Sequence, residues 1–271
     1  NLFSYISNNE LSKTFFFNDL KSGNYFWKRF LAGAFVAIVM TGLDQDMMQK
    51  NLTCRNLRDA QKNMFWFTIV LVVVNFLFLA LGVLLTDYAQ QNGINAQKDT
   101  LFPIIATKGT LGITTAIFFV LGLIAAAYSS ADSALTSLTT SFSIDILEID
   151  KNKAQQQQEK IRKRIHIIFS LILIITILIF KYFIANESVI AKIFTFANYT
   201  YGPLLGLYAF GLFTKLKSKD KWIPLICILS PIITYFLNYF SLILYGFNFG
   251  YALLIVNGCV TFIGLYLLKR E

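Results

Sequence analysis

The sequence predicts an all-α, polytopic membrane protein with about seven transmembrane helices. Hydrophobic residues make up 56% of the 271 residues and charged residues only 14%, which is too apolar for a soluble domain of this size. The apolar runs are continuous over about 20 residues, as a transmembrane helix requires, whereas strands of a membrane barrel would alternate over about 10 residues. Lys and Arg are also concentrated in every second loop between these runs.

The first candidate span is short, because its strictly apolar part (residues 30–43) contains 14 residues, with Gly33 and Gly42 among them. Short, glycine-interrupted apolar segments are typical of broken helices at transporter binding sites. A tilted, unbroken helix with an aromatic belt at residues 25–27 is an equally good interpretation. The seven expected spans are Phe26–Leu43, Asn63–Thr86, Gly109–Thr140, Arg164–Ile184, Ser188–Phe213, Trp222–Tyr245 and Phe249–Leu268.

Three connecting segments have recognisable patterns. Residues 42–63 are polar with Met47, Met48 and Leu52 at helical spacing, which predicts a helix at the membrane interface. Residues 99–108 predict a short helix across the outer face. The run Gln155–Gln158 is low in complexity and indicates a solvated linker.

The charge distribution predicts the orientation. Sixteen Lys and Arg residues fall in the loops after the first, third and fifth spans and in the tail, against three in the opposite loops. Cytoplasmic loops carry the excess of these residues, so we expect a cytoplasmic C-terminus and an extracellular N-terminal segment. The same excess explains the net charge of +9 without a nucleic-acid partner.

Few residues offer metal or catalytic chemistry. Cys54, Cys227 and Cys259 have no paired spacing, so neither a disulfide framework nor a zinc site is indicated. His166, the sole histidine, lies at a basic helix start and is interpreted as interfacial. We expect no enzyme, because an intramembrane serine nucleophile would need an embedded base that neither His166 nor a GxSxG-type turn supplies.

The third span changes from apolar to hydroxyl-rich at residue 129. Ser129, Ser130 and Ser133 share one face of the expected helix, and Asp132 lies beside it. Hard cations such as sodium prefer oxygen ligands, and neutral hydroxyls bind an ion without adding a buried charge. Two other interpretations stay open: a helix end outside the membrane, or hydroxyls that bond neighbouring helices.

Three segments occur in the order found in a known transporter family: GLDQDMMQKNL (residues 42–52), AAAYSSADSALTSLTTSFSIDIL (125–147) and GPLLGLYAFGLF (202–213). They resemble motifs of the sodium:solute symporter family, which includes sodium/glucose, sodium/proline and sodium/sialic acid cotransporters. The resemblance implies a leucine-transporter-like fold built from two inverted five-helix repeats. Residues 1–213 would be the second repeat with its extracellular N-terminal segment, and residues 214–271 two peripheral helices. Since the chain starts with Asn1 and not Met, we expect a fragment that lacks the first repeat.

The resemblance also implies which residues bind sodium. The carbonyl of Ala126 and the hydroxyls of Ser129 and Ser130 would hold the main ion. Asp132 and Ser133 occupy the place where some relatives bind a second ion. Asp132 replaces the serine expected there, which weakens that second assignment.

The substrate positions depart from those of the sugar carriers. Ala37 and Met40 replace an Asn and a gating Tyr, which argues against glucose or galactose bound in the same way. Phe194, Phe196, Tyr199 and Tyr201 are candidates for an aromatic gate, although such clusters are more often packing. The full sets are Ala37, Met40, Thr41, Phe196 and Tyr199 for the solute, and Asp44, Gln45, Gly202 and Pro203 for gating or coupling.

The sequence therefore predicts a secondary transporter that couples sodium to the uptake of a small organic solute. Its expected location is the plasma membrane, or the inner membrane in a bacterium, within the lipid bilayer. A seven-helix receptor is the alternative from another class, but it gives the hydroxyl-rich face no role. The solute and the oligomeric state stay open.

Overall fold

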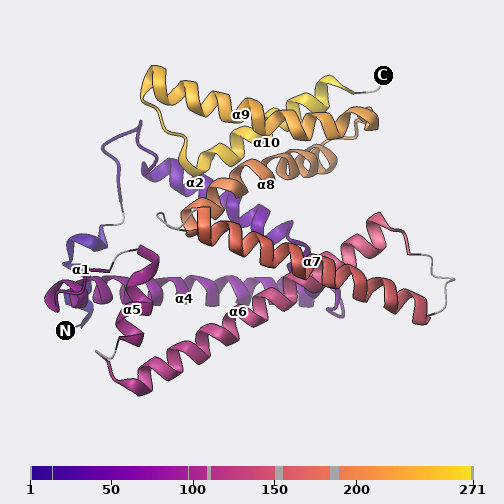
Figure 1. Cartoon of the computed structure of the whole chain (residues 1–271). Helices are drawn as coiled ribbons and strands as arrows, with labels where there is room; N and C mark the ends of the chain where they lie inside the picture. The colour runs from indigo at the N-terminus through magenta and orange to yellow at the C-terminus, as the bar shows by residue number, and fades with distance from the viewer. Residues whose placement is uncertain are drawn as a thin grey trace. The chain divides into compact units, whose positions relative to one another are not determined.

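The computed structural model describes residues 2–13, 15–96, 98–108, 111–149, 155–183 and 189–269. Regular structure in this part of the chain is helical, apart from one isolated β-bridge between Ser218 and Lys269 (Figure 1). Each expected span coincides with a helix, although Gly109, Ile184 and Ser188, at the ends of three spans, lie outside the described residues. The corresponding helices are α2 (Phe26–Ala37) with η2 (Ile38–Gly42), α4 (Leu57–Gln91), α6 (Ile113–Ser141) with η4 (Phe142–Ile146), α7 (Gln155–Phe183), α8 (Val189–Phe213), α9 (Ile223–Tyr245) and α10 (Leu253–Leu267).

Five helices of the described chain are long and apolar enough to cross a membrane, and a broken pair makes a sixth candidate. The broken pair joins residues 26–42 to α3 (Gln45–Leu52), with a bend of 56° at the break, so the interruption lies at the end of the first expected span. The remaining expected span, the fifth in chain order, is α8; it is a helix of 25 residues but falls below that hydropathy, because polar residues occupy its centre around Asn198. The protein is an all-α, polytopic membrane protein.

Two helices begin well before the expected spans. The α4 helix begins at Leu57, six residues before the expected span, because the side chain of Asn56 accepts a hydrogen bond from the backbone N–H of Asp59 at 2.9 Å and caps the helix. Gln155–Gln158 are not a linker but the first turn of α7. Glutamine is a good helix former, so this run extends the helix that follows it.

The described chain forms two compact units. Unit 1 comprises residues 1–12 and 45–189, and contains α1 (Leu2–Ser7), α3, α4, the short helix α5 (Leu101–Thr107), α6 and α7. Its small core joins Leu85 and Ala89 of α4 to Ile105 of α5, which is the short helix expected between residues 99 and 108. The apolar stretches of α4, α6 and α7 otherwise expose large side chains, as lipid-facing helices do.

Unit 2 comprises residues 13–44 and 190–271, and contains α2, η2, α8, α9 and α10. Within it α9 packs along α10, and α2 packs on the start of α10. Lys28 fixes the start of α2, because its Nζ donates to the carbonyl of Asn248 at 2.9 Å and lies 3.8 Å from the Phe247 ring centroid. The helices α9 and α10 thus share a unit with α2 and α8, whereas the division at residue 213 into repeat and peripheral helices stays a prediction.

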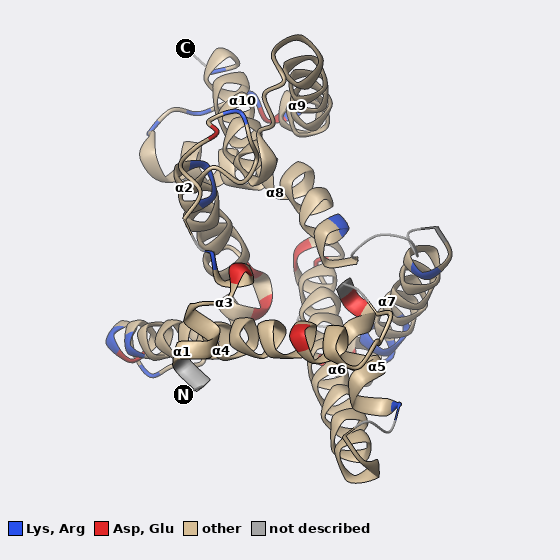
Figure 2. Cartoon of the chain, turned by 90° about the vertical axis from the view of Figure 1, so that its left-hand side faces the viewer, with Lys and Arg blue, Asp and Glu red and all other residues tan. Residues whose placement is uncertain are grey.

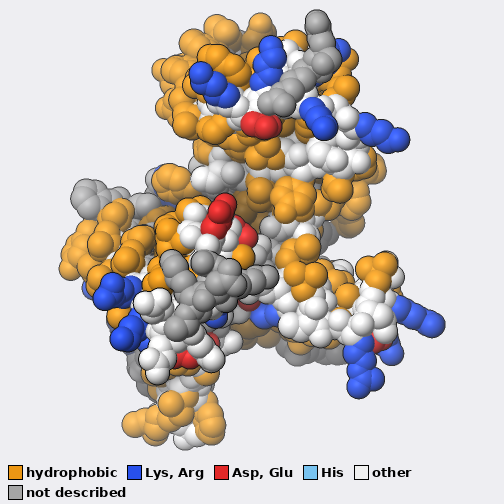
Figure 3. Space-filling view, turned by 90° about the vertical axis from the view of Figure 1, so that its right-hand side faces the viewer, with side chains coloured by type: hydrophobic (Ala, Val, Ile, Leu, Met, Phe, Trp, Pro, Cys, Tyr) orange, Lys and Arg blue, Asp and Glu red, His pale blue; other side chains and the backbone are white. Residues whose placement is uncertain are grey.

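Charged side chains are sparse along the membrane helices. Figure 2 shows Lys and Arg in blue mainly at helix ends and in connections, while the long helices are largely tan. In the space-filling view, orange hydrophobic side chains cover much of the helix surface (Figure 3). This pattern is typical of helices whose sides contact lipid and whose ends contact water.

Candidate functional site

The hydroxyl-rich segment of the third span is the second half of α6. This helix continues without a break from Ile113 to Ser141, so no helix end separates the apolar half from the hydroxyls. Ala126, Ser129 and Ser130 are exposed in unit 1, which leaves the proposed sodium ligands uncovered by the other residues of that unit. Asp132 is also exposed, whereas Ser133, one position further on, is half-buried.

Ser133 is half-buried because α3 packs on α6 at this point. Its Oγ donates a hydrogen bond to Oδ1 of Asp46 at 2.6 Å. The other carboxylate oxygen of Asp46 accepts from Lys50, one turn further along α3, also at 2.6 Å. Asp46 was not among the predicted site residues, although it lies in the same Asp-Gln-Asp motif as Asp44 and Gln45.

The end of α6 has an unusual set of hydroxyls. Ser137 and Ser143 are buried, and their Oγ atoms, like that of Ser141, have no hydrogen-bond partner among the described residues. The Oγ1 atom of Thr139 on the same helix lies 3.3 Å from Nδ1 of His166, and this hydrogen bond connects α6 to α7. The segment η4 that follows is a π-helix, a form that often marks functional sites in proteins.

The first span carries a second π-helix, and the predicted solute residues lie in and beside it. Ala37 is the last residue of α2, while Met40 and Thr41 lie inside η2. Ala37 is exposed and the other two are half-buried within unit 2. The helix then stops at Leu43 and Asp44, so backbone groups near Thr41 leave the regular helical hydrogen-bond pattern.

The remaining solute residues, and the gating residues Gly202 and Pro203, lie on α8. Phe196 is exposed, whereas the ring of Tyr199 is half-buried 6.3 Å from that of Tyr235 on α9. Gly202 and Pro203 are buried in the interior of the same helix. Of the other aromatic candidates, Phe194 packs at 5.6 Å on Tyr251, which is a packing contact within unit 2.

The structure thus groups the predicted residues in two sets. The sodium candidates all lie on α6 in unit 1, and Gln45 lies on α3 of the same unit. The solute candidates lie on the end of α2, on η2 and on α8 in unit 2, which also contains Asp44. Among the described residues there is no group of three or more His, Cys, Asp and Glu side chains that could hold a metal ion. The sodium site predicted from the sequence uses hydroxyl and carbonyl oxygens for the main ion, with the carboxylate of Asp132 only at the second position.

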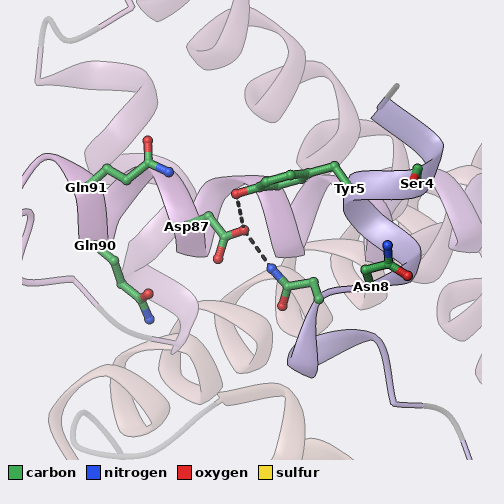
Figure 4. A pocket seen from close by; sticks show the side chains of 7 residues that line it. Ser4, Tyr5, Asn8, Asp87, Gln90 and Gln91 are labelled. Atoms are coloured by element: carbon green, nitrogen blue, oxygen red, sulfur yellow. Dashed lines mark hydrogen bonds between the residues drawn. The ribbon is translucent and has the colours of Figure 1, made fainter.

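Two pockets lie elsewhere in unit 1. A polar pocket of about 580 Å³ lies between α1 and the C-terminal end of α4 (Figure 4). There Asp87 accepts from the hydroxyl of Tyr5 at 2.9 Å and from Nδ2 of Asn9 at 2.7 Å, and the carboxylate raises the pKa of the Tyr5 phenol. A more apolar pocket of about 620 Å³ lies between α3 and α4, lined by Met48, Leu52 and Met64 among others. None of the predicted site residues lines either pocket.

The chain has a distant relative among characterised transporters. It is 26% identical to the sodium/sialic acid symporter NanT of Aliivibrio fischeri over an alignment of 199 residues that covers 69% of this chain. The predicted resemblance to the sodium:solute symporters is therefore confirmed at the level of a distant relationship. The chain spans 38% of the length of that symporter. No protein-family model matches the chain, and no solved structure matches it.

Proposed function

We propose that the chain is part of a sodium-coupled symporter that carries a small organic solute across a membrane. The observation that supports this most directly is the continuous α6 helix, in which the hydroxyl motif directly follows an apolar membrane segment. About 20 residues cross the hydrocarbon core, so a crossing that begins at Ile113 reaches Asp132. Ser129 and Ser130 then lie inside the membrane, where a lipid-facing helix would have apolar residues.

The predicted ligands of the main sodium ion have defined roles in this mechanism. Ala126, Ser129 and Ser130 supply oxygens to sodium, and groups outside this chain complete the coordination. Neutral ligands suit an ion that must be released in every cycle, because no full opposite charge holds it. Ion and solute each raise the affinity of the protein for the other by the same factor, so the sodium gradient loads the solute site.

The solute site belongs to the broken first span and to α8. Transporters use interrupted helices near the middle of the membrane to expose backbone groups to substrate and ions, and η2 with its break at residues 43–44 has that form. Ala37 and Met40 offer no side-chain hydrogen bond to a sugar hydroxyl. Sialic acid, named for the relative from Aliivibrio fischeri, is the first solute to test, and glucose and galactose are the controls.

The topology follows from the charges. The C-terminus is cytoplasmic, residues 1–213 form the second five-helix repeat, and residues 214–271 form two peripheral helices. A seven-helix receptor is the weaker alternative, because it assigns no role to the hydroxyls of α6.

The test is uptake into proteoliposomes that contain the full-length protein. We expect labelled sialic acid, or another small solute from a screen, to accumulate when a sodium gradient is imposed and not when potassium replaces sodium. Equal uptake in the two salts would contradict sodium coupling. Sodium-driven galactose uptake would contradict the interpretation of Ala37 and Met40.

A further inference from the structure

The α8 helix contains a proline in its interior. Pro203 has no backbone N–H, so the carbonyl of Tyr199, four residues earlier, loses its normal intrahelical donor. An unpaired carbonyl inside a membrane is costly, because no water is present to replace the donor. Tyr199 is also a predicted solute residue, so the conformation of this turn bears directly on the proposed site.

A side chain of the neighbouring helix supplies the lost donor. Nδ2 of Asn257, on α10, donates to the carbonyl of Tyr199 at 3.0 Å and to that of Asn198 at 3.1 Å. Asn257 is fully buried. Its two N–H groups therefore supply a donor to the carbonyl of Tyr199, which Pro203 leaves without one, and a further donor to the carbonyl of Asn198.

This contact requires glycine on α8. A Cβ atom at Gly202 would overlap the side chain of Asn257, and one at Gly206 would lie 2.5 Å from Cβ of Thr261 and 2.6 Å from the carbonyl of Gly258. The two glycines are four residues apart and lie on one face of α8, the small-xxx-small arrangement that lets membrane helices approach closely. The sequence of α8 is thus adapted to the position of Asn257.

The asparagine also carries a penalty. Its Oδ1 is buried and has no hydrogen-bond partner among the described residues. A leucine of similar size would avoid an unsatisfied polar atom in the interior of the protein. The donor groups of the amide are therefore the feature that explains an asparagine at this position.

We propose that Asn257 is a positioning residue, which replaces the donor missing at Pro203 and so fixes the backbone of α8 at Tyr199. The claim that Asn257 positions Tyr199 for the solute rests on the proposed transport activity. The claim that Asn257 replaces the missing hydrogen-bond donor is independent of that activity. The proposal gives α10 a role beyond membrane anchoring, because its Asn257 side chain stabilises the proline-containing turn of α8.

The proposal predicts that the two positions are coupled. Alanine at position 203 restores an N–H that can donate to the carbonyl of Tyr199, so it makes the donors of Asn257 less important. In the full-length protein in detergent, we expect Asn257→Leu to lower the unfolding temperature by about 2–4 °C. In a Pro203→Ala background the loss should be less than half as large. Equal losses in the two backgrounds would overturn the proposal.

Thr261→Val is the matched control. Thr261 is equally buried on α10 and contacts Gly206, but its hydroxyl bonds Ser230 at 2.8 Å and the carbonyl of Asn257 at 3.0 Å, not α8. Its loss of stability should be the same in the unmodified protein and in the Pro203→Ala background. Should Asn257→Leu fail to fold, Asn257→Ala removes the same donor with a smaller side chain and is read in the same cycle.

Uptake provides the functional readout. Asn257→Leu should raise the KM for the solute several-fold with a smaller change in maximal rate. In the Pro203→Ala background, measured against Pro203→Ala alone, the rise in KM should be smaller. An unchanged KM would contradict the positioning role. If the unmodified protein transports nothing, the proposed function fails, whereas the stability cycle still decides whether Asn257 replaces the missing donor.

Discussion

The hydroxyl of Ser133 on α6 donates to the carboxylate of Asp46 on α3 at 2.6 Å, so the two family-like motifs of unit 1 are in direct contact. The donated proton points at Asp46, and the lone pairs of the same oxygen stay available to a cation. Ser133 can therefore hold α3 in place and still serve as an ion ligand. A change in the position of α3 would move one oxygen of the proposed second sodium site.

The first prediction concerns this contact. Asp46→Asn keeps the size of the side chain but removes its charge, and hydrogen bonds to charged groups contribute about 1.5–3 kcal/mol against about 1 kcal/mol for neutral ones. We expect the unfolding temperature of the purified protein to fall by a few degrees. Lys50→Met is the control, because it removes only an ion pair whose lysine is 58% exposed, worth about 0–1 kcal/mol. A larger loss for Lys50→Met than for Asp46→Asn would contradict the assignment.

The second prediction concerns topology. In a variant without the three native cysteines, a cysteine at Gln156 should react with an impermeant thiol reagent only from the cytoplasmic side. A cysteine at Asn95 should react only from outside. Gln156 and Asn95 are both exposed, and the connection near Gln156 is rich in Lys and Arg whereas the one near Asn95 is not. Labelling in the reverse sense would overturn the span order and the cytoplasmic C-terminus.

The third prediction separates one sodium ion from two. Asp132 is exposed beside the half-buried Ser133 and replaces a serine expected from the family resemblance. If it binds a second ion, Asp132→Ser should change the steepness with which uptake depends on sodium concentration. Asp59→Ser, which removes a carboxylate at the start of α4, is the control and should leave that steepness unchanged. An unaltered steepness in Asp132→Ser would mean that Asp132 has no part in ion coupling.

Most of the helices could be predicted from the sequence, since continuous apolar runs leave no alternative to membrane helices. Boundaries were less accurate where local polar chemistry decides them. The early start of α4 depends on the Asn56 cap, and its signal, Asn56 followed three residues later by Asp59, is visible in the sequence. Gln155–Gln158 are helical although low complexity is typical of a linker, because glutamine is a good helix former.

The contacts of the candidate site were less predictable. An interior proline always leaves one carbonyl without its donor, so Pro203 could have indicated that Tyr199 needs a partner. No local pattern identifies Asn257, 58 residues away, as that partner. Likewise Ser133 and Asp46 are 87 residues apart, and their contact arises from the packing of α3 on α6.

The central claim is that the hydroxyls of α6 bind the coupling ion, and Ser130→Ala tests it most directly. The change removes one ligand oxygen and little volume, so expression and folding should survive. Thr140→Val is the control, because the Thr140 hydroxyl already bonds the carbonyl of Thr136 at 2.8 Å on the same helix.

The decisive measurement is solute uptake by the full-length protein as a function of sodium concentration, compared among unmodified protein, Ser130→Ala and Thr140→Val. We predict that Ser130→Ala needs about tenfold more sodium for half-maximal uptake, the effect of about 1.4 kcal/mol of lost ion binding, and that high sodium partly restores transport. Thr140→Val should keep the sodium dependence of the unmodified protein. Unaltered sodium dependence in both Ser130→Ala and the parallel Ser129→Ala would contradict the account and leave the hydroxyls of α6 as helix packing.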